Sequence, residues 1–246
     1  MSTKFDFKDL DSEGFETLEA IASANAFNHW MYQSILPWCK GTVLEIGSGI
    51  GNISKFFLDA GYQICLTDIR DNYCERLKEQ FEGNNKLIGV KNIDIVHPEF
   101  DTKYAEFFES FDTVFALNVV EHIEDDAQAL KNIYKLLRKG GKVIILVPAY
   151  QALYNRFDEE LYHYRRYNAT MLKGIIQGGG FKIIKSFYFN FMGIPGWFVS
   201  GKLQRNKTIP KGQMKLYNSL VPIFKIIDRI FMRKIGLSVV CVGEKS

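Results

Sequence analysis

A glycine-rich turn at residues 47–51 is the part of this sequence most suited to chemistry. Gly47, Gly49 and Gly51 follow the apolar run at residues 43–46. Glycine at alternate positions lets a ligand approach the backbone closely. Glu45 stands two residues before the first glycine. For unit charges about 4 Å apart at an effective dielectric constant of about 20, this carboxylate would repel a pyrophosphate, or attract a cation, by about 4 kcal/mol. The turn therefore favours a cationic ligand, and its GxGxG spacing differs from that of dinucleotide sites.

Acidic residues at the ends of the next two strand-like segments fit a nucleoside. Asp68 ends the segment 63–68, where a carboxylate can accept hydrogen bonds from both ribose hydroxyls. Asp94 and Ile95 close the segment 88–96, where they would face the amine and the ring of an adenine. For Asp94, an ordinary aspartate at a strand end is the open alternative. S-adenosylmethionine carries an ammonium, a sulfonium and a nucleoside but no phosphate, so it is the predicted cofactor.

The elements that must position these residues alternate between β-branched runs and amphipathic segments. We expect strands at residues 42–46, 63–68, 88–96, 111–118, 142–148, 181–189 and 237–244. Such alternation is typical of a parallel sheet with crossover helices. The clearest helix is predicted over 125–137, ended by Gly140 and Gly141, and a long amphipathic helix is predicted over 216–231.

Five segments within residues 42–148 together resemble the class I S-adenosylmethionine-dependent methyltransferases. In order, they are LEIGSGIGN, TDIR, NIDIV, FDTVFALNVVEHIEDD and LLRKGGKVIILVP. The chain is most similar to the ubiquinone-type subgroup, methyltransferase types 11 and 12. The resemblance implies a Rossmann-like α/β fold, with a seven-stranded, mostly parallel sheet, helices on both faces and an antiparallel last strand. It assigns the methionine part to Glu45, Gly47, Gly49 and Gly51, the ribose to Asp68, and the reacting centre to Leu117 and Asn118.

The methyl acceptor should bind beyond the carboxyl ends of the parallel strands. The segment 149–167 belongs there, and its aromatic rings and guanidinium groups suit a sugar, a quinol or a phosphorylated headgroup. Its candidate substrate-binding residues are Tyr150, Tyr154, Arg165, Arg166 and Tyr167. An acceptor hydroxyl must lose its proton, and His122 and His163 are the candidate catalytic bases. A structural role is the open alternative for both histidines.

The resemblance also bears on a metal. Some ubiquinone-type enzymes carry acidic residues on both sides of the segment corresponding to VVEH, here residues 119–122, and use a divalent cation. In this chain Asn118 stands where a carboxylate is expected. We therefore predict no metal site.

The chain should form one core with an elaboration, as its 246 residues allow. We expect a helical lead-in over 1–40 and a cofactor-binding core over 41–189 and 237–246. The residues 190–236 are interpreted as an insertion that caps the active site. Within it, we favour a packed long helix over one that lies in a membrane interface.

The charge distribution leaves the partner open. The net charge is +3, yet positions 201–246 hold ten Lys or Arg and two acidic residues, a net charge of +8. Such a segment can contact an anionic membrane, a phosphorylated substrate or a nucleic acid. We predict methyl transfer to oxygen on a small or lipid-linked acceptor. A nucleic-acid methyltransferase or binding protein is the alternative, disfavoured because no Asn/Asp-Pro-Pro-Tyr stretch follows the fourth strand.

The remaining features favour the cytoplasm. The N-terminal residues lack the basic flank and apolar run of a signal peptide, and no apolar stretch reaches the roughly 20 residues that span a bilayer. The cysteines form no CxxC pair, which argues against a zinc site or a disulfide framework. We expect a cytoplasmic protein, with contact at the inner face of the membrane as the open alternative.

Overall fold

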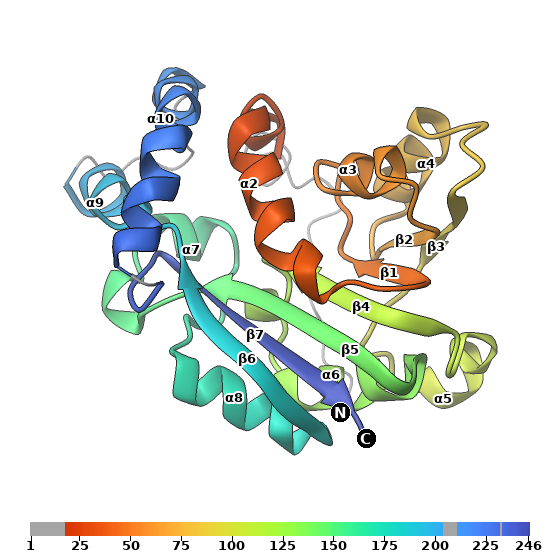
Figure 1. Cartoon of the computed structure of the whole chain (residues 1–246). Coiled ribbons are helices and arrows are strands. Elements are labelled where there is room, and N and C mark those ends of the chain that lie inside the picture. The colour runs from red at the N-terminus through yellow and green to blue at the C-terminus, as the bar shows by residue number, and fades with distance from the viewer. Residues whose placement is uncertain (1–17, 204–210, 232) are drawn as a thin grey trace.

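One sheet organises the computed structural model, which describes residues 18–203, 211–231 and 233–246. Its seven strands in the described part of the chain follow the order β3-β2-β1-β4-β5-β7-β6 (Figure 1). They are β1 (Val43–Ile46), β2 (Ile64–Asp68), β3 (Leu87–Asn92), β4 (Phe111–Leu117), β5 (Leu137–Pro148), β6 (Phe181–Phe189) and β7 (Ser238–Lys245). Strands β1 to β5 pair in parallel, whereas β7 is antiparallel to β5 and β6. The predicted fold class is confirmed, including the antiparallel last strand.

Helices cover both faces of the sheet (Figure 1). One face carries α2 (Asn25–Ile35), α3 (Ser54–Asp59), α4 (Asp71–Gln80) and α10 (Lys211–Ile230), and the other carries α5 (Phe100–Lys103), α6 (Asp126–Leu136) and α8 (Ala169–Gly178). The short α7 (Arg156–Glu160) and α9 (Gly193–Trp197) follow β5 and β6. Five further turns are η1 (Leu36–Trp38), η2 (Ala105–Phe107), η3 (Val120–His122), η4 (Gln151–Leu153) and the π-helical η5 (Phe198–Leu203).

The core lies on both sides of the sheet because strand side chains alternate between its faces. In β4, Val114 and Ala116 belong to the cluster that packs under α6, whereas Phe115 belongs to the cluster on the α3 side. The rings of Phe115 and Phe57 stack there with centroids 4.9 Å apart. Buried strands of this kind fix the sheet edge at which the glycine turn emerges.

Two predicted boundaries are wrong. Helix α6 ends at Leu136, and Gly140 and Gly141 lie inside β5 rather than at a helix end. Leu137 pairs with Phe111 of β4, so strand pairing overrides the helical pattern, and the register between the two strands shifts just beyond this pair. Strand β3 is also shorter than predicted and ends at Asn92, so Asp94 and Ile95 follow the strand.

Helix α10 is packed on one side only. Its buried residues Met214, Val221 and Phe224 face the body of the protein, as the packed interpretation predicts. Its opposite side leaves apolar side chains exposed: Leu216, Ile223, Ile226 and Ile230. Among the described residues, no helix has the length and apolar character needed to cross a membrane.

Candidate active site

The glycine turn between β1 and α3 adopts a backbone that side chains resist. Gly47, Gly49 and Gly51 have φ angles of 70°, 54° and 80°. A Cβ at Gly47 would lie 2.5 Å from a methyl carbon of Val119, and one at Gly51 would lie 2.7 Å from the ring of Phe81. Both backbone conformation and close packing therefore demand glycine here.

Asp68 at the end of β2 holds this turn in place. The Gly49 N–H donates to Asp68 Oδ2 at 2.9 Å, and the Arg70 N–H donates to Oδ1 at 3.0 Å. Burial raises the pKa of Asp68 above its usual value, and these two hydrogen bonds act in the opposite direction. The carboxylate lies in the cavity wall. It can therefore order the turn and still present oxygen to a ligand.

Glu45 of β1 lies beneath the turn with little contact to solvent. The Ser54 hydroxyl donates a hydrogen bond to Glu45 Oε2. Burial raises the pKa of Glu45 to about 8, against the effect of the serine hydrogen bonds. Near neutral pH the carboxyl group therefore holds a proton, which a ligand ammonium would displace.

We expect the unliganded protein to lose stability as the pH rises from 6 to 8, partly through Glu45. Its pKa is about 8 in the folded protein and about 4.3 in an unfolded chain, so folding takes up a proton in this window and the free energy of unfolding falls as pH rises. Glu45→Gln removes this pH dependence. The free energy of unfolding of the variant, relative to that of wild type, should therefore rise by about 2 kcal/mol between pH 6 and pH 8. Urea unfolding at both pH values measures it, with the exposed Glu99→Gln as control. If Glu45→Gln and wild type differ in their free energy of unfolding by the same amount at pH 6 and pH 8, the raised pKa does not belong to Glu45.

A cavity of about 810 Å³ lies beside the turn. Most of the predicted site residues line it, namely Glu45, Gly47, Gly49, Asp68, Asp94, Ile95, Leu117, Asn118, His122, His163 and Arg166. Gly51, Tyr150, Tyr154, Arg165 and Tyr167 do not belong to its wall. The structure thus brings the predicted cofactor side and both candidate histidines to one cavity.

Four of the predicted substrate-binding residues lie behind the wall instead. The Tyr154 hydroxyl donates to the His163 carbonyl at 2.8 Å, and the Tyr167 hydroxyl donates to Asp126 at 2.8 Å. Arg165 also donates to Asp126, at 2.9 Å, and Tyr150 stacks on Tyr188 with ring centroids 5.2 Å apart. These contacts support the segment that carries His163, and substrate binding by the four residues stays a prediction.

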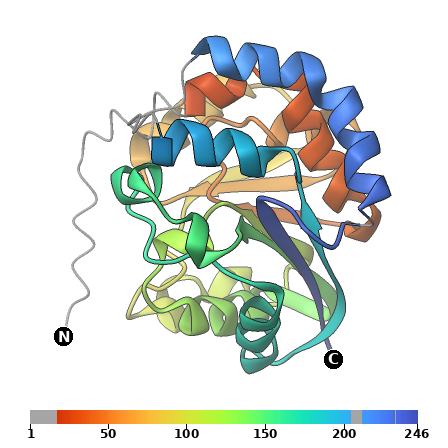
Figure 2. The ribbon, with the colours of Figure 1, turned by 90° about the vertical axis from the view of Figure 1, so that its left-hand side faces the viewer.

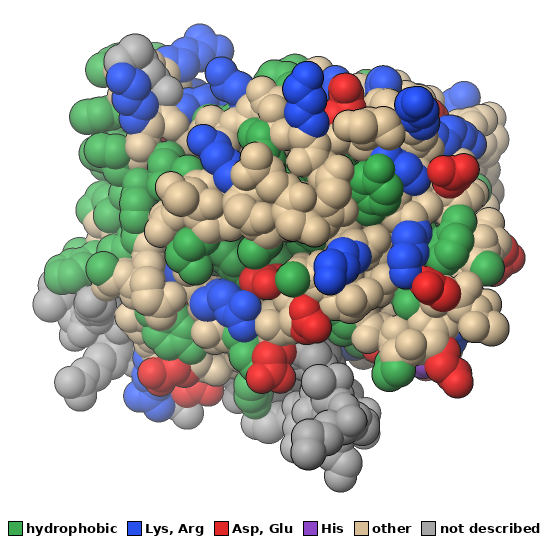
Figure 3. Space-filling view, turned by 90° about the horizontal axis from the view of Figure 1, so that it is seen from below, with side chains coloured by type: hydrophobic (Ala, Val, Ile, Leu, Met, Phe, Trp, Pro, Cys, Tyr) green, Lys and Arg blue, Asp and Glu red, His purple; other side chains and the backbone are tan. Residues whose placement is uncertain are grey.

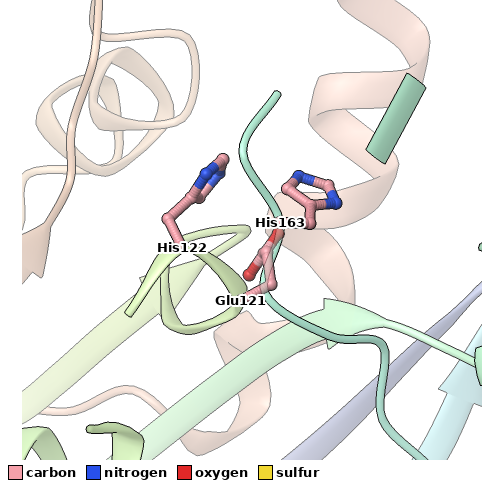
Figure 4. Close-up of side chains that lie close together, drawn as sticks. All are labelled: Glu121, His122 and His163. Carbon is pink, nitrogen blue, oxygen red and sulfur yellow. The ribbon is translucent and has the colours of Figure 1, made fainter. Parts of the chain in front are cut away.

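Glu121, His122 and His163 gather at the cavity (Figure 4). Glu121 and His122 come from η3 after β4, whereas His163 comes from the loop after α7. One nitrogen or oxygen atom of each lies within 4.8 Å of the others. Burial raises the pKa of Glu121 to about 8, and burial together with the nearby His163 lowers the pKa of His122 to about 3. Glu121 is not among the predicted site residues, since nothing local in the sequence distinguishes it from any other acidic residue that follows a strand.

Asp158 of α7 fixes His163 from behind. Its Oδ1 lies 2.8 Å from His163 Nδ1 and accepts a hydrogen bond from Arg166 Nε, also at 2.8 Å. Although burial alone would raise it, the hydrogen bonds from His163 and Arg166 hold the pKa of Asp158 below its usual value. The Arg166 guanidinium lies 4.6 Å from the ring centroid of Trp197. A fully buried ion pair thus orients one imidazole in the cavity wall.

The fold and the glycine turn together define the class of protein. The sheet order and the antiparallel β7 are those of the Rossmann-like, class I S-adenosylmethionine-dependent methyltransferases. Residues 44–143 match the family described as methyltransferase domain. This part of the chain is therefore similar to that family.

Solved structures share the fold at low sequence identity. Phosphoethanolamine N-methyltransferase 2 of Haemonchus contortus, in complex with S-adenosyl-L-methionine, is 20% identical with a TM-score of 0.59, over 87% of this chain and 52% of that one. A SAM-dependent methyltransferase of Archaeoglobus fulgidus is 16% identical with a TM-score of 0.55, over 89% of this chain and 94% of that one.

Curated relatives match only in part. Probable polyketide synthase 42 of Dictyostelium discoideum is 28% identical over 151 residues, which are 53% of this chain and 6% of that protein. The tRNA U34 carboxymethyltransferase of Sulfurimonas denitrificans is 36% identical over 85 residues, 34% of this chain and 26% of that protein. The chain thus spans a small part of these relatives, which act in different settings.

Proposed function

We propose that this chain transfers a methyl group from S-adenosylmethionine to an oxygen of a small or lipid-linked acceptor. The observation that carries the proposal is one cavity whose wall holds both the glycine turn with Asp68 and the cluster of Glu121, His122 and His163. The first group suits a cationic nucleoside, and the second group suits a hydroxyl that must lose its proton.

The residues of this chain have separate tasks in such a reaction. When bound, S-adenosylmethionine supplies the methyl group from its sulfonium, in an in-line displacement by the acceptor oxygen. Asp68 accepts hydrogen bonds from the ribose, and Glu45 attracts the ammonium. The apolar remainder of the wall excludes water and holds the acceptor in line. Glu121, His122 and His163 form the polar end at which the acceptor hydroxyl is held.

The mouth of the cavity supports an acceptor with an apolar chain. Val199 of η5 and Leu216 of α10 line the cavity and also stand exposed, at 42% and 63% of their surface. Figure 2 shows α7, α9 and α10 gathered at one end of the sheet. Along α10 the exposed residues Ile223, Ile226 and Ile230 continue this apolar surface. Figure 3, which views the molecule from below, shows hydrophobic side chains gathered along its left edge.

Cations next to this apolar stripe favour an anionic membrane as its partner. Lys225, Arg229 and Arg233 line a hollow between α2 and α10. An amphipathic helix with exposed isoleucines and neighbouring cations can lie in the interface of a lipid bilayer. We therefore propose that α10 contacts the membrane and that a lipid-linked acceptor enters the cavity from there.

We expect the wild-type chain to float with vesicles that contain anionic lipid and the double variant Ile226→Asp, Ile230→Asp to float at least 10-fold less. Each isoleucine contributes about 1.5–3 kcal/mol when it leaves water. Met171→Asp, an exposed apolar position on α8 across the sheet, is the matched control and should float like wild type. Flotation of the double variant at the wild-type level, or no flotation of wild type on any vesicle, would remove the membrane proposal.

Isotopically labelled cofactor tests the reaction itself. We would incubate the chain with a cell extract and labelled S-adenosylmethionine, and search lipid, small-molecule and RNA fractions by mass spectrometry for one labelled methyl group. Label on an oxygen of a lipid or small molecule, absent with Asp68→Ala, supports the proposal. Label in RNA would instead support the nucleic-acid alternative, for which the basic composition of residues 201–246 and the similarity to the tRNA enzyme are the arguments. Binding of the cofactor without any product would contradict both.

A further inference from the structure

We propose that Glu121, His122 and His163 bind one divalent transition-metal ion at the acceptor end of the cavity. This inference deepens the proposed function of the same site, and metal binding can be measured without any methyl transfer. It differs from the prediction of no metal, which rested on the position of Asn118. The structure supplies His163, from a segment 41 residues beyond His122, as a third donor that the motif alone could not reveal.

The surroundings of Glu121 are the observation that indicates a bound cation. Its side chain has no exposed surface, and neither carboxylate oxygen has a hydrogen-bond partner among the described residues. A buried carboxyl group without a partner is costly, and the cost reaches several kcal/mol when the group is ionised. The buried guanidinium of Arg166 does not serve, because it donates to Asp158 and to the Ala149 carbonyl. A metal ion would give Glu121 the partner that it lacks.

His163 is prepared to be a ligand. Asp158 can only accept from His163 Nδ1, at 2.8 Å, so this nitrogen carries the proton and Nε2 keeps its lone pair. A carboxylate behind a metal-binding imidazole fixes its tautomer and orientation in just this way. The rings of His163 and His122 lie with centroids 4.6 Å apart, nearly perpendicular. Two imidazoles and a carboxylate therefore meet around one point in the wall (Figure 4).

The donor set selects the class of ion. Metal bonds to imidazole nitrogen and carboxylate oxygen are about 2.0–2.2 Å long, so donors within 4.8 Å of one another need only small side-chain rotations to share an ion. Two nitrogens and one oxygen suit Zn²⁺, Co²⁺ or Mn²⁺ better than Mg²⁺ or Ca²⁺, which prefer oxygen. Three protein ligands leave coordination positions open toward the cavity, where a bound metal can polarise an acceptor oxygen.

Titration of the chelator-treated chain tests the site in the absence of cofactor. We would follow Zn²⁺ and Co²⁺ by calorimetry and by the visible absorption of Co²⁺, and Mn²⁺ by loss of its free electron paramagnetic resonance signal. We expect one ion per chain, with affinity at least 100-fold lower in His163→Ala and in Glu121→Gln. Glu121→Gln keeps the shape of the side chain and replaces a carboxyl group that has no hydrogen-bond partner by a neutral amide, so it should melt no lower than wild type.

Two further variants separate ligation from general disturbance. Asp158→Asn should weaken metal binding about 10–100-fold through the orientation of His163. His97→Ala, a histidine outside the cavity wall, should bind metal like wild type. No stoichiometric binding of any of the three ions, or equal binding by wild type and Glu121→Gln, overturns the proposal. Loss of methyl transfer with metal binding intact would instead count against the proposed reaction.

Discussion

Asp68→Ala lowers the affinity for S-adenosylhomocysteine by about 100-fold or more, which is the largest effect that we expect on binding at the cofactor site. The carboxylate can accept hydrogen bonds from two ribose hydroxyls, and a hydrogen bond to a charged group contributes about 1.5–3 kcal/mol. The variant also removes the acceptor of the Gly49 N–H, at 2.9 Å, so the glycine turn loses its tie to β2. Both losses act on the same ligand. Isothermal titration calorimetry measures the change.

Three comparisons make this result specific. Asp59→Ala changes an exposed aspartate on α3 and should leave the affinity unchanged. Gly49→Val should lose binding as Asp68→Ala does, because residue 49 has a φ of 54°, a conformation that a β-branched residue resists. The wild-type chain should bind S-adenosylhomocysteine and not NAD. If folded Asp68→Ala binds within threefold of wild type, Asp68 is not the ribose ligand.

Arg166→Met destabilises the folded chain by about 3–5 kcal/mol, the largest effect on stability that we expect. Removing one partner of a buried ion pair leaves the other charge without compensation, and this costs about 3–5 kcal/mol. The side chains of Arg166 and Asp158 are 1% and 0% exposed. The loss would affect His163 as well, since this histidine would then be the one side-chain hydrogen-bond partner of Asp158 among the described residues. Urea unfolding measures the change.

The preceding residue provides a matched control. Arg165 also pairs with a carboxylate, that of Asp126 at 2.9 Å, but its side chain is 31% exposed. Solvent screens such a pair, so Arg165→Met should cost about 1 kcal/mol or less. If Arg166→Met and Arg165→Met lower the free energy of unfolding equally, burial of the pair between Arg166 and Asp158 does not determine its contribution to stability.

The cofactor side of the site could be predicted because its signals are local in the chain. Strand residues alternate over a few positions, and the glycines mark a turn whose φ angles only glycine adopts easily. Glu45 and Asp68 then follow from their places at the ends of two neighbouring parallel strands. The structure places both residues in the wall of one cavity beside the turn, and their binding of the cofactor stays a prediction.

The acceptor end of the cavity is formed by segments that are far apart in the sequence. No local sequence pattern predicts which of them come together. The path of the loop after α7 brings His163 to Glu121 and turns Tyr154 and Tyr167 behind the wall. Pairing of Leu137 with Phe111 likewise made a strand where the sequence suggested the end of a helix.

The sequence by itself determined the succession of strands along the chain, the glycine turn and the acidic residues beside it, since each depends on neighbouring residues along the backbone. The tertiary structure alone decided that Glu121 is buried without a partner and that one side of α10 is left uncovered. Helical periodicity defines two faces of α10, but only packing against the rest of the chain selects which of them meets water.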